Sequence, residues 1–182
     1  MSDGHKVKPS EQRGGTTPDE AEIREKGEWA ASANEGDVLS SVGLGSCIGL
    51  ALVDEQHGVL GLAHILLPAS RDGAGPAPGK FADTAVPALI DRMMRLGAVK
   101  RAFEAILVGG AQMFSFGAKS QLDIGARNEE ATRKALQLQG IPVRAAATAG
   151  NKGRTVNVYV GHRAVTVKEA GGREVPLFGR IP

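Results

Sequence analysis

The chain contains a single cysteine, Cys47, and a histidine, His64, that lies within an otherwise apolar segment. A cysteine thiolate is a nucleophile, and a neighbouring histidine can take the thiol proton and stabilise the thiolate. Taken singly, each residue has a simpler interpretation, because a lone cysteine usually packs as a small apolar residue and a buried histidine is usually a hydrogen-bonded core residue. The chemistry is favoured by the spacing of the two residues on the elements that carry them.

Residues 48–53 and 59–68 form two apolar segments of strand length, separated by the polar residues 54–58. This pattern predicts a β-hairpin. Both segments are apolar on both faces, so we expect the hairpin to lie centrally in a sheet that is covered on each side. If the hairpin turns between Glu55 and Gln56, Cys47 faces His64 directly, with Cβ atoms ~5 Å apart. A shift of one residue would place them on opposite faces, and the sequence alone leaves the register open.

The glycine-rich residues 43–49, which surround the cysteine, do not match a dinucleotide-binding loop. That motif needs G-x-G-x-x-G at the start of a helix, whereas here the third glycine is one place late and a strand is expected to follow. Residues 150–155 likewise lack the spacing of a phosphate-binding P-loop. Flexible backbone beside a nucleophile has another use, because its N–H groups can point at a developing oxyanion. We expect Ser46 and Cys47 to provide such donors.

The elements that must position these residues follow from apolar periodicity. Helical spacing over residues 86–94 predicts a helix that ends at Gly97. Asp83 or Thr84 is the expected N-cap, which would leave Pro87 in the first turn.

A second helix is expected over residues 126–139, with Ala131, Ala135 and Leu138 on its apolar face. Further strands are expected near residues 38–42, 105–108, 141–147, 155–160 and 164–167. The fold class is therefore α/β: a single domain with a mixed β-sheet, whose central hairpin is covered by two main helices in a layered sandwich.

Residues 1–36 differ from the body in composition, with five basic residues, eight acidic residues and few large apolar side chains. Such a stretch buries too little apolar surface to offset the entropy of ordering, so we expect a disordered N-terminal arm. A single domain is expected over residues 37–168, with a C-terminal tail over 169–182.

Composition also excludes some classes of partner and some cellular locations. The net charge is only +2 and the basic residues are scattered, so no nucleic-acid partner is expected. No apolar stretch reaches the roughly 18 residues that span a bilayer, and the N-terminus lacks the apolar core of a secretory signal. We expect a cytoplasmic protein without membrane insertion. The other histidines, His5, His57 and His162, form no ligand cluster, so neither a metal nor a cofactor is expected.

Six short motifs occur in order along the body: residues 44–47 (LGSC), 61–68 (GLAHILLP), 80–87 (KFADTAVP), 109–114 (GGAQMF), 124–128 (IGARN) and 150–155 (GNKGRT). Together they resemble the CheD family of chemoreceptor glutamine deamidases over residues 37–167. The resemblance implies a hydrolase of chemotactic adaptation, cytoplasmic and associated with receptor arrays. Its substrates would be glutamines of methyl-accepting chemotaxis receptors, and it could also hydrolyse receptor methyl esters.

The resemblance implies a cysteine nucleophile, a histidine base and a threonine that orients the histidine. These roles fall on Cys47, on His64 and on Ser41, where the serine keeps the hydroxyl and lacks the methyl group.

The loop residues Gln112, Asn151 and Arg154 either border the substrate or stabilise their loops by hydrogen bonds. The apolar residues 113–116 are expected either in the core or at a contact with a protein partner.

The resemblance also implies a partner, a CheC-type response-regulator phosphatase. A regulatory module that activates this phosphatase is therefore the alternative function. The paired thiol and imidazole favour the enzyme, because an adaptor has no use for them.

Overall fold

The computed structural model describes residues 20–23, 28–70, 77–112 and 124–181. Within these ranges the strands form two five-stranded sheets. Sheet A contains, in spatial order, β1 (Glu20–Ile23), β3 (Val38–Leu44), β8 (Arg154–Tyr159), β9 (Ala164–Glu169) and β10 (Glu174–Phe178). Sheet B contains β2 (Trp29–Ser32), β5 (Val59–Ile65), β4 (Ile48–Asp54), β6 (Glu104–Gly109) and β7 (Val143–Thr148).

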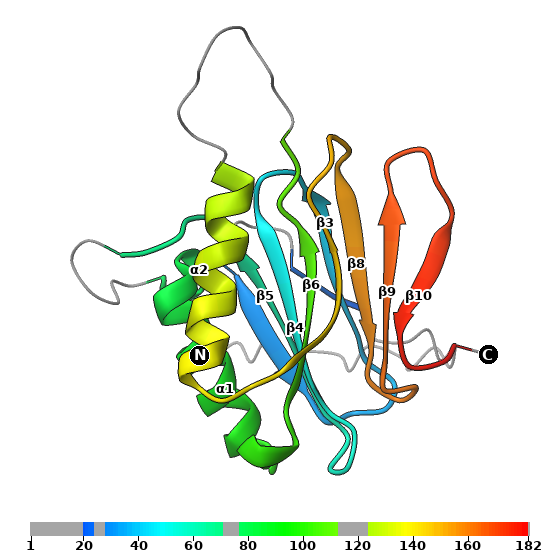
Figure 1. Ribbon diagram of the computed structural model, residues 1–182. Coiled ribbons are helices and arrows are strands. Elements are labelled where there is room, and N and C mark those ends of the chain that lie inside the picture. The colour runs from blue at the N-terminus through cyan, green and yellow to red at the C-terminus, as the bar shows by residue number, and fades with distance from the viewer. Residues whose placement is uncertain (1–19, 24–27, 71–76, 113–123, 182) are drawn as a thin grey trace, which may run out of the picture.

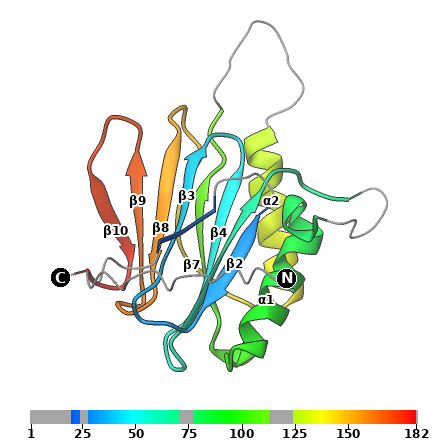
Figure 2. The ribbon, with the colours of Figure 1, turned by 180° about the vertical axis from the view of Figure 1, so that it is seen from behind.

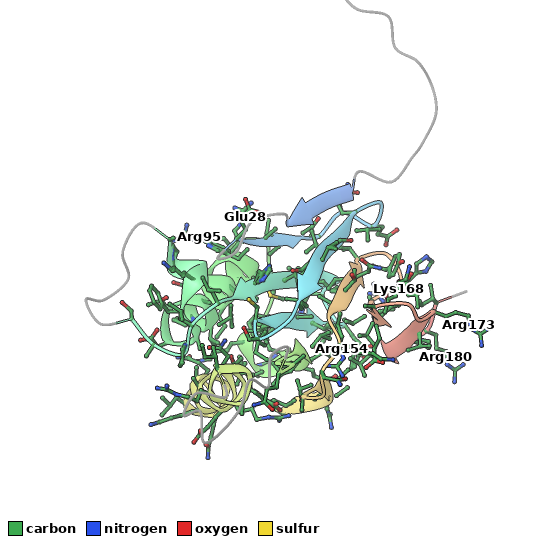
Figure 3. All side chains as sticks on the ribbon, turned by 90° about the horizontal axis from the view of Figure 1, so that it is seen from above. Glu28, Arg95, Arg154, Lys168, Arg173 and Arg180 are labelled. Carbon is green, nitrogen blue, oxygen red and sulfur yellow. The ribbon has the colours of Figure 1, made fainter. Side chains whose placement is uncertain are left out.

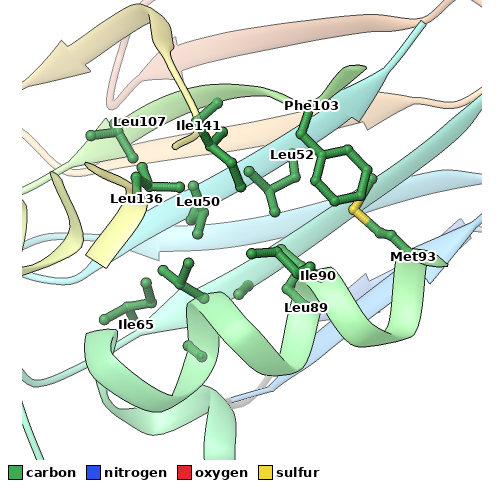
Figure 4. Close-up of a cluster of buried hydrophobic side chains, with 14 of the residues drawn as sticks. Leu50, Leu52, Ile65, Leu89, Ile90, Met93, Phe103, Leu107, Leu136 and Ile141 are labelled. Carbon is green, nitrogen blue, oxygen red and sulfur yellow. The ribbon is translucent and has the colours of Figure 1, made fainter. Parts of the chain in front are cut away.

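The molecule has three layers: two helices, then sheet B, then sheet A. Helices α1 (Ala82–Arg95) and α2 (Ile124–Leu138) lie on one side of the molecule, and β8, β9 and β10 lie on the other (Figure 1). Side chains alternate along β4, so Leu50 and Leu52 pack in the core under the helices, as Figure 4 shows. Ala51 and Val53 pack in a second core between the sheets. Strands buried on both faces explain the uninterrupted apolar segments of the hairpin. The predicted layered α/β fold is confirmed, with two sheets where a single mixed sheet was expected.

The hairpin register differs from the prediction. Gly49 lies opposite His64, and Asp54 lies opposite Val59, so residues 55–58 form the turn. The predicted pairing of Cys47 with His64 is therefore wrong by two residues. The reason is the Asp54 carboxylate, which accepts a hydrogen bond from the His57 backbone N–H (3.0 Å) and so stabilises a longer turn. A shift of two residues keeps every side chain on its predicted face.

Helix α1 begins at Ala82, earlier than predicted, and Phe81 occupies the N-cap position without a side-chain cap. Thr84, one of the two predicted N-caps, instead donates its hydroxyl to the carbonyl of Pro78 (2.6 Å). Pro87 lies inside the helix, beyond the first turn, which corrects its predicted position. Gly97 follows the helix end with a φ of 98°, in agreement with the predicted stop. Among the described residues, no helix is long and apolar enough to cross a membrane.

Helix α2 forms where it is expected, and its buried face agrees with the prediction in part. Ala131 and Ala135 are partly buried and pack against the core, as predicted. Leu138, also predicted on the apolar face, is 78% exposed. The fully buried positions are Gly125, Asn128, Thr132 and Leu136, and three of these four are polar residues or glycine, so apolar periodicity did not reveal them.

The structure also differs from the expectation at both ends of the body. Strand β2 (Trp29–Ser32) pairs antiparallel with β5 at the edge of sheet B (Figure 2), and β1 pairs in parallel with β3. These two strands contradict a wholly disordered arm over residues 1–36; residues 1–19 and 24–27 lie outside the described residues. The predicted tail, 169–182, contains β10, which pairs with β9. Seen from above, Arg173 and Arg180 lie outermost on the side opposite the helices (Figure 3).

Candidate active site

The core between the two sheets contains a buried histidine–serine contact. Ser41 extends from β3 of sheet A and His64 from β5 of sheet B, and they are 0% and 3% exposed. The Ser41 hydroxyl and Nδ1 of His64 are 3.1 Å apart, so a hydrogen bond joins the two sheets. The second ring nitrogen, Nε2, is buried as well. The contact fixes the plane of the imidazole inside the sandwich.

Cys47 lies on the same face of sheet B as His64. It immediately precedes β4, is 4% exposed, and packs with Ala51 and Val53 in the core between the sheets. Because Gly49 lies opposite His64, Cys47 takes the diagonal position, where Cα atoms are separated by roughly 7–8 Å and longer side chains remain within reach. The thiol and the imidazole therefore project into the same interior space, although they do not lie directly opposite each other as predicted.

Gly49, the residue opposite His64, has no room for a side chain. A Cβ atom at this position would lie 2.7 Å from Cδ1 of Leu44 and 3.0 Å from Cγ1 of Val156. The absence of a side chain allows β3 and β8 to pack closely against β4 beside the histidine. This close approach brings Ser41 of sheet A within reach of His64 of sheet B.

The loop that carries Cys47 is held by the end of β6. The carbonyl of Cys47 accepts a hydrogen bond from the N–H of Gly110 (2.8 Å), and the carbonyl of Gly45 accepts one from Ala111 (2.7 Å). Gly109 has a φ of 111°, and a Cβ atom there would lie 2.3 Å from the carbonyl oxygen of Cys47. Only glycine satisfies both the backbone angle and the close approach. The backbone around the thiol is therefore rigidly supported.

The predicted loop residues gather at this end of the sandwich. Gln112 is exposed, and its backbone N–H donates to the carbonyl of Gly150 (2.8 Å), which brings it next to the exposed Asn151. Among the residues that the structure describes, neither side chain makes a hydrogen bond that assigns it a function. Contact of these two residues with a substrate stays a prediction, and residues 113–116 lie outside the described residues.

Arg154 is directed into the protein. Its guanidinium donates to the carbonyl of Ala149 (2.6 Å) and to that of Gly109 (3.3 Å), and it forms an ion pair with Glu169 (2.9 Å). These contacts hold the loop before β8 against the glycine that supports Cys47. They are the contacts expected of a loop-stabilising residue, the second of the two interpretations given for Arg154.

Sequence reasoning assigned no role to Asn128, which the structure places at the site. This residue of α2 is fully buried, and its Nδ2 donates to the carbonyl of Ser46 and to the carbonyl of Leu66, both at 2.9 Å. One side chain thus connects the cysteine loop with the segment that follows His64. The available signal was a polar residue within the motif 124–128, on a helix that packs against the sheet.

The arrangement provides a buried thiol, an oriented imidazole and a loop backbone held by hydrogen bonds to the carbonyls of Gly45, Ser46 and Cys47. These are the parts that acyl transfer from an amide or ester requires. In the part of the chain that the structure describes, no group of three or more histidine, cysteine or acidic side chains could hold a metal ion.

Comparison with known proteins identifies the family of the chain. The family model described as CheD chemotactic sensory transduction matches residues 66–169, so the chain belongs to the CheD family. The matched range begins after His64, so the assignment does not depend on Ser41, Cys47 or His64.

Curated relatives extend the comparison to most of the chain. The chain is 46% identical over 135 residues to a protein of Clostridium novyi (strain NT). The aligned region covers 73% of this chain and 83% of the relative. It is 44% identical over 141 residues to a protein of Clostridium tetani. This aligned region covers 76% of this chain and 86% of the relative. Both relatives carry the name probable chemoreceptor glutamine deamidase CheD.

Proposed function

We propose that this protein deamidates glutamine side chains of methyl-accepting chemotaxis receptors, with Cys47 as nucleophile, His64 as base and Ser41 as the residue that orients His64. The observation that carries the proposal is the 3.1 Å contact between Ser41 and Nδ1 of His64, on the same interior face as Cys47. Membership of the CheD family and the names of the relatives support the substrate class.

In the first half of the reaction, the Cys47 thiolate attacks the side-chain carbonyl carbon of a receptor glutamine. The carbonyl oxygen becomes an oxyanion, which backbone N–H groups at Ser46 and Cys47 stabilise. The C–N bond then breaks, and the His64 imidazolium gives its proton to the departing ammonia. The product of this half is a thioester between Cys47 and the receptor.

In the second half, neutral His64 takes a proton from water, and the resulting hydroxide attacks the thioester carbonyl. The C–S bond breaks, the thiolate is regenerated, and the receptor side chain leaves as glutamate. Throughout the cycle Nδ1–H of His64 donates to the Ser41 hydroxyl, so Nε2 is the nitrogen that exchanges protons. A glutamyl methyl ester would form the same thioester with methanol as the leaving group, which accounts for a second activity at the same site.

Two further features of the proposal concern location and partners. The protein acts where its receptors cluster, in the receptor arrays, and a CheC-type phosphatase is a second partner. Both rest on the resemblance to the CheD family.

The test is to incubate the purified protein with receptor cytoplasmic fragments and to map glutamine-to-glutamate conversion by mass spectrometry. The parent protein should convert specific glutamines, and Cys47→Ala should convert none. Conversion by neither protein, or by both, would contradict the proposal. A parent protein that converts no glutamine but stimulates a CheC-type phosphatase would instead support the regulatory alternative.

A further inference from the structure

Three successive carbonyl groups of the cysteine loop are each bound by a donor from elsewhere in the chain. Gly45 accepts from the backbone N–H of Ala111 and Cys47 from that of Gly110, at 2.7 and 2.8 Å. The carbonyl between them, that of Ser46, accepts from a side chain instead, Nδ2 of Asn128 (2.9 Å). Asn128 is therefore the side chain that holds the carbonyl of the Ser46–Cys47 peptide.

The orientation of the Ser46 carbonyl determines the direction of the Cys47 N–H. A peptide bond is planar and trans, so its C=O and N–H groups point in opposite directions. Because Asn128 draws the Ser46 carbonyl towards α2, the N–H of Cys47 points away from α2. This N–H is one of the oxyanion donors in the proposed mechanism, and its direction decides how well it stabilises the transition state.

The second bond of Asn128 reaches the segment that follows the strand carrying the base. Nδ2 also donates to the carbonyl of Leu66 (2.9 Å), two residues beyond His64. An amide nitrogen carries two hydrogens, and both are used here on carbonyl acceptors, which also fixes which end of the amide faces the site. A single side chain thus ties the nucleophile loop to the segment after the histidine.

Apolar packing does not by itself account for an asparagine at this position. The side chain is 0% exposed, and within the described residues its Oδ1 has no hydrogen-bond partner. Burying an unpaired polar atom lowers the free energy of unfolding, whereas a leucine of similar size would add apolar burial on this helix face. The two directed bonds are what an apolar residue could not supply.

We propose that Asn128 is a positioning residue that holds the Ser46–Cys47 peptide with the Cys47 N–H directed at the oxyanion. The inference rests on the proposed function and deepens it. Its effect is exerted on the transition state, since the oxyanion forms only during the reaction.

The experiment compares Asn128→Ala with the parent protein and with Thr132→Ala. Thr132 is a matched control because it is equally buried on α2, one turn further along, and its hydroxyl donates only to the backbone carbonyl of Asn128. Asn128→Ala should lower kcat for a receptor fragment about 10²-fold, the loss typical of one oxyanion donor, with KM changed less than about threefold. Thr132→Ala should keep kcat within about threefold of the parent value.

Alkylation of Cys47 by iodoacetamide distinguishes a positioning role of Asn128 from a merely structural one. A structural defect would lower the alkylation rate and kcat together. This displacement forms no oxyanion, so its rate in Asn128→Ala should stay close to the parent rate while kcat falls. An unchanged kcat in folded Asn128→Ala would overturn the inference, as would an equal loss in Thr132→Ala or an alkylation rate that falls in proportion to kcat.

If Asn128→Ala does not fold, Asn128→Ser decides, because its hydroxyl can replace one of the two bonds. A folded Ser variant should show an intermediate loss of kcat, and parental kcat would overturn the inference. A parent protein that deamidates no receptor overturns the proposed function together with this inference. An active parent protein and an equally active Asn128 variant overturn the inference alone.

Discussion

The two ends of the β4–β5 hairpin each contain a histidine bound through Nδ1, but the partners differ in kind. At the site end, His64 is 3% exposed and contacts the neutral hydroxyl of Ser41 at 3.1 Å. At the turn end, the side chain of His57 is 33% exposed and contacts the carboxylate of Asp54 at 2.8 Å. The same pair of strands thus supports two different uses of an imidazole.

The difference shows what suits a histidine for proton transfer and what suits it for structure. A hydroxyl carries no net charge, so it can orient the His64 ring without adding a charge beside a group that must gain and lose a proton. Asp54 instead accepts from the His57 ring, from the His57 N–H and from the N–H of Val99 (2.8 Å). Its carboxylate joins the turn to the segment after α1, which is a purely structural task.

The largest expected effect separates the two histidines by activity. His64→Ala should lower turnover of a receptor glutamine about 10²–10⁴-fold, because it removes the proposed general base. His57→Ala should keep turnover within about twofold, because its contacts lie at the far end of the hairpin. Deamidation rates of both folded variants, measured by mass spectrometry, test this contrast; similar losses in both would remove the distinction between the two ends.

A smaller loss of turnover is expected when Ser41, the hydrogen-bond partner of His64, is replaced. Ser41→Ala should lower turnover about 10-fold to 100-fold with little change in KM, because only the orientation of the imidazole is disturbed. Ser41→Thr should retain activity, since it keeps the hydroxyl and supplies the residue that the family resemblance implies. The kinetic constants of both variants on one receptor glutamine provide the measurement.

The double variant sharpens the assignment of Ser41. If Ser41 acts through His64, the loss caused by Ser41→Ala should shrink when His64 is already alanine, because residues of one catalytic unit are not additive. Strict additivity would mean that Ser41 acts independently of His64 and would leave a pair of Cys47 and His64.

The hairpin was predictable because its apolar segments are long and buried on both faces. The predicted register was wrong by two residues, but a shift of two residues still leaves Cys47 and His64 on the same face. The register itself depends on a side chain, since the bonds of Asp54 stabilise a turn longer than the one predicted. Periodicity determines faces well, whereas turn length depends on individual hydrogen bonds.

The contact between Ser41 and His64 joins two different sheets, and apolar patterning does not say which strands of separate sheets face each other. Ser41 was therefore identified through the family resemblance and not through spacing.

Asn128 was not predicted for a related reason. The buried face of α2 carries polar residues and glycine, and the predicted apolar face included the exposed Leu138. Edge strand β2 was missed because it has only four residues and follows a charged segment, although Trp29 and Ala31 pack against the core under the helices.

The smallest expected effect on activity, and a measurable one on stability, is at Asp54. Burial raises the pKa of this carboxyl, but the hydrogen bonds from the N–H groups of Val99 and His57 and from the His57 ring outweigh burial, so the pKa is lowered overall. A carboxyl with a lowered folded-state pKa stabilises the fold above its unfolded pKa of ~3.9, and this stabilisation is lost as the pH falls through the lower, folded value.

Asp54→Asn should therefore reduce the free energy of unfolding by about 1–3 kcal/mol at pH 7, with turnover close to that of the parent. In denaturant titrations the gap between parent and variant should narrow as the pH falls below about 4. A gap that stays constant with pH would mean that the charge of Asp54 is not what stabilises the turn, and a large loss of turnover would mean that the two ends of the hairpin are coupled.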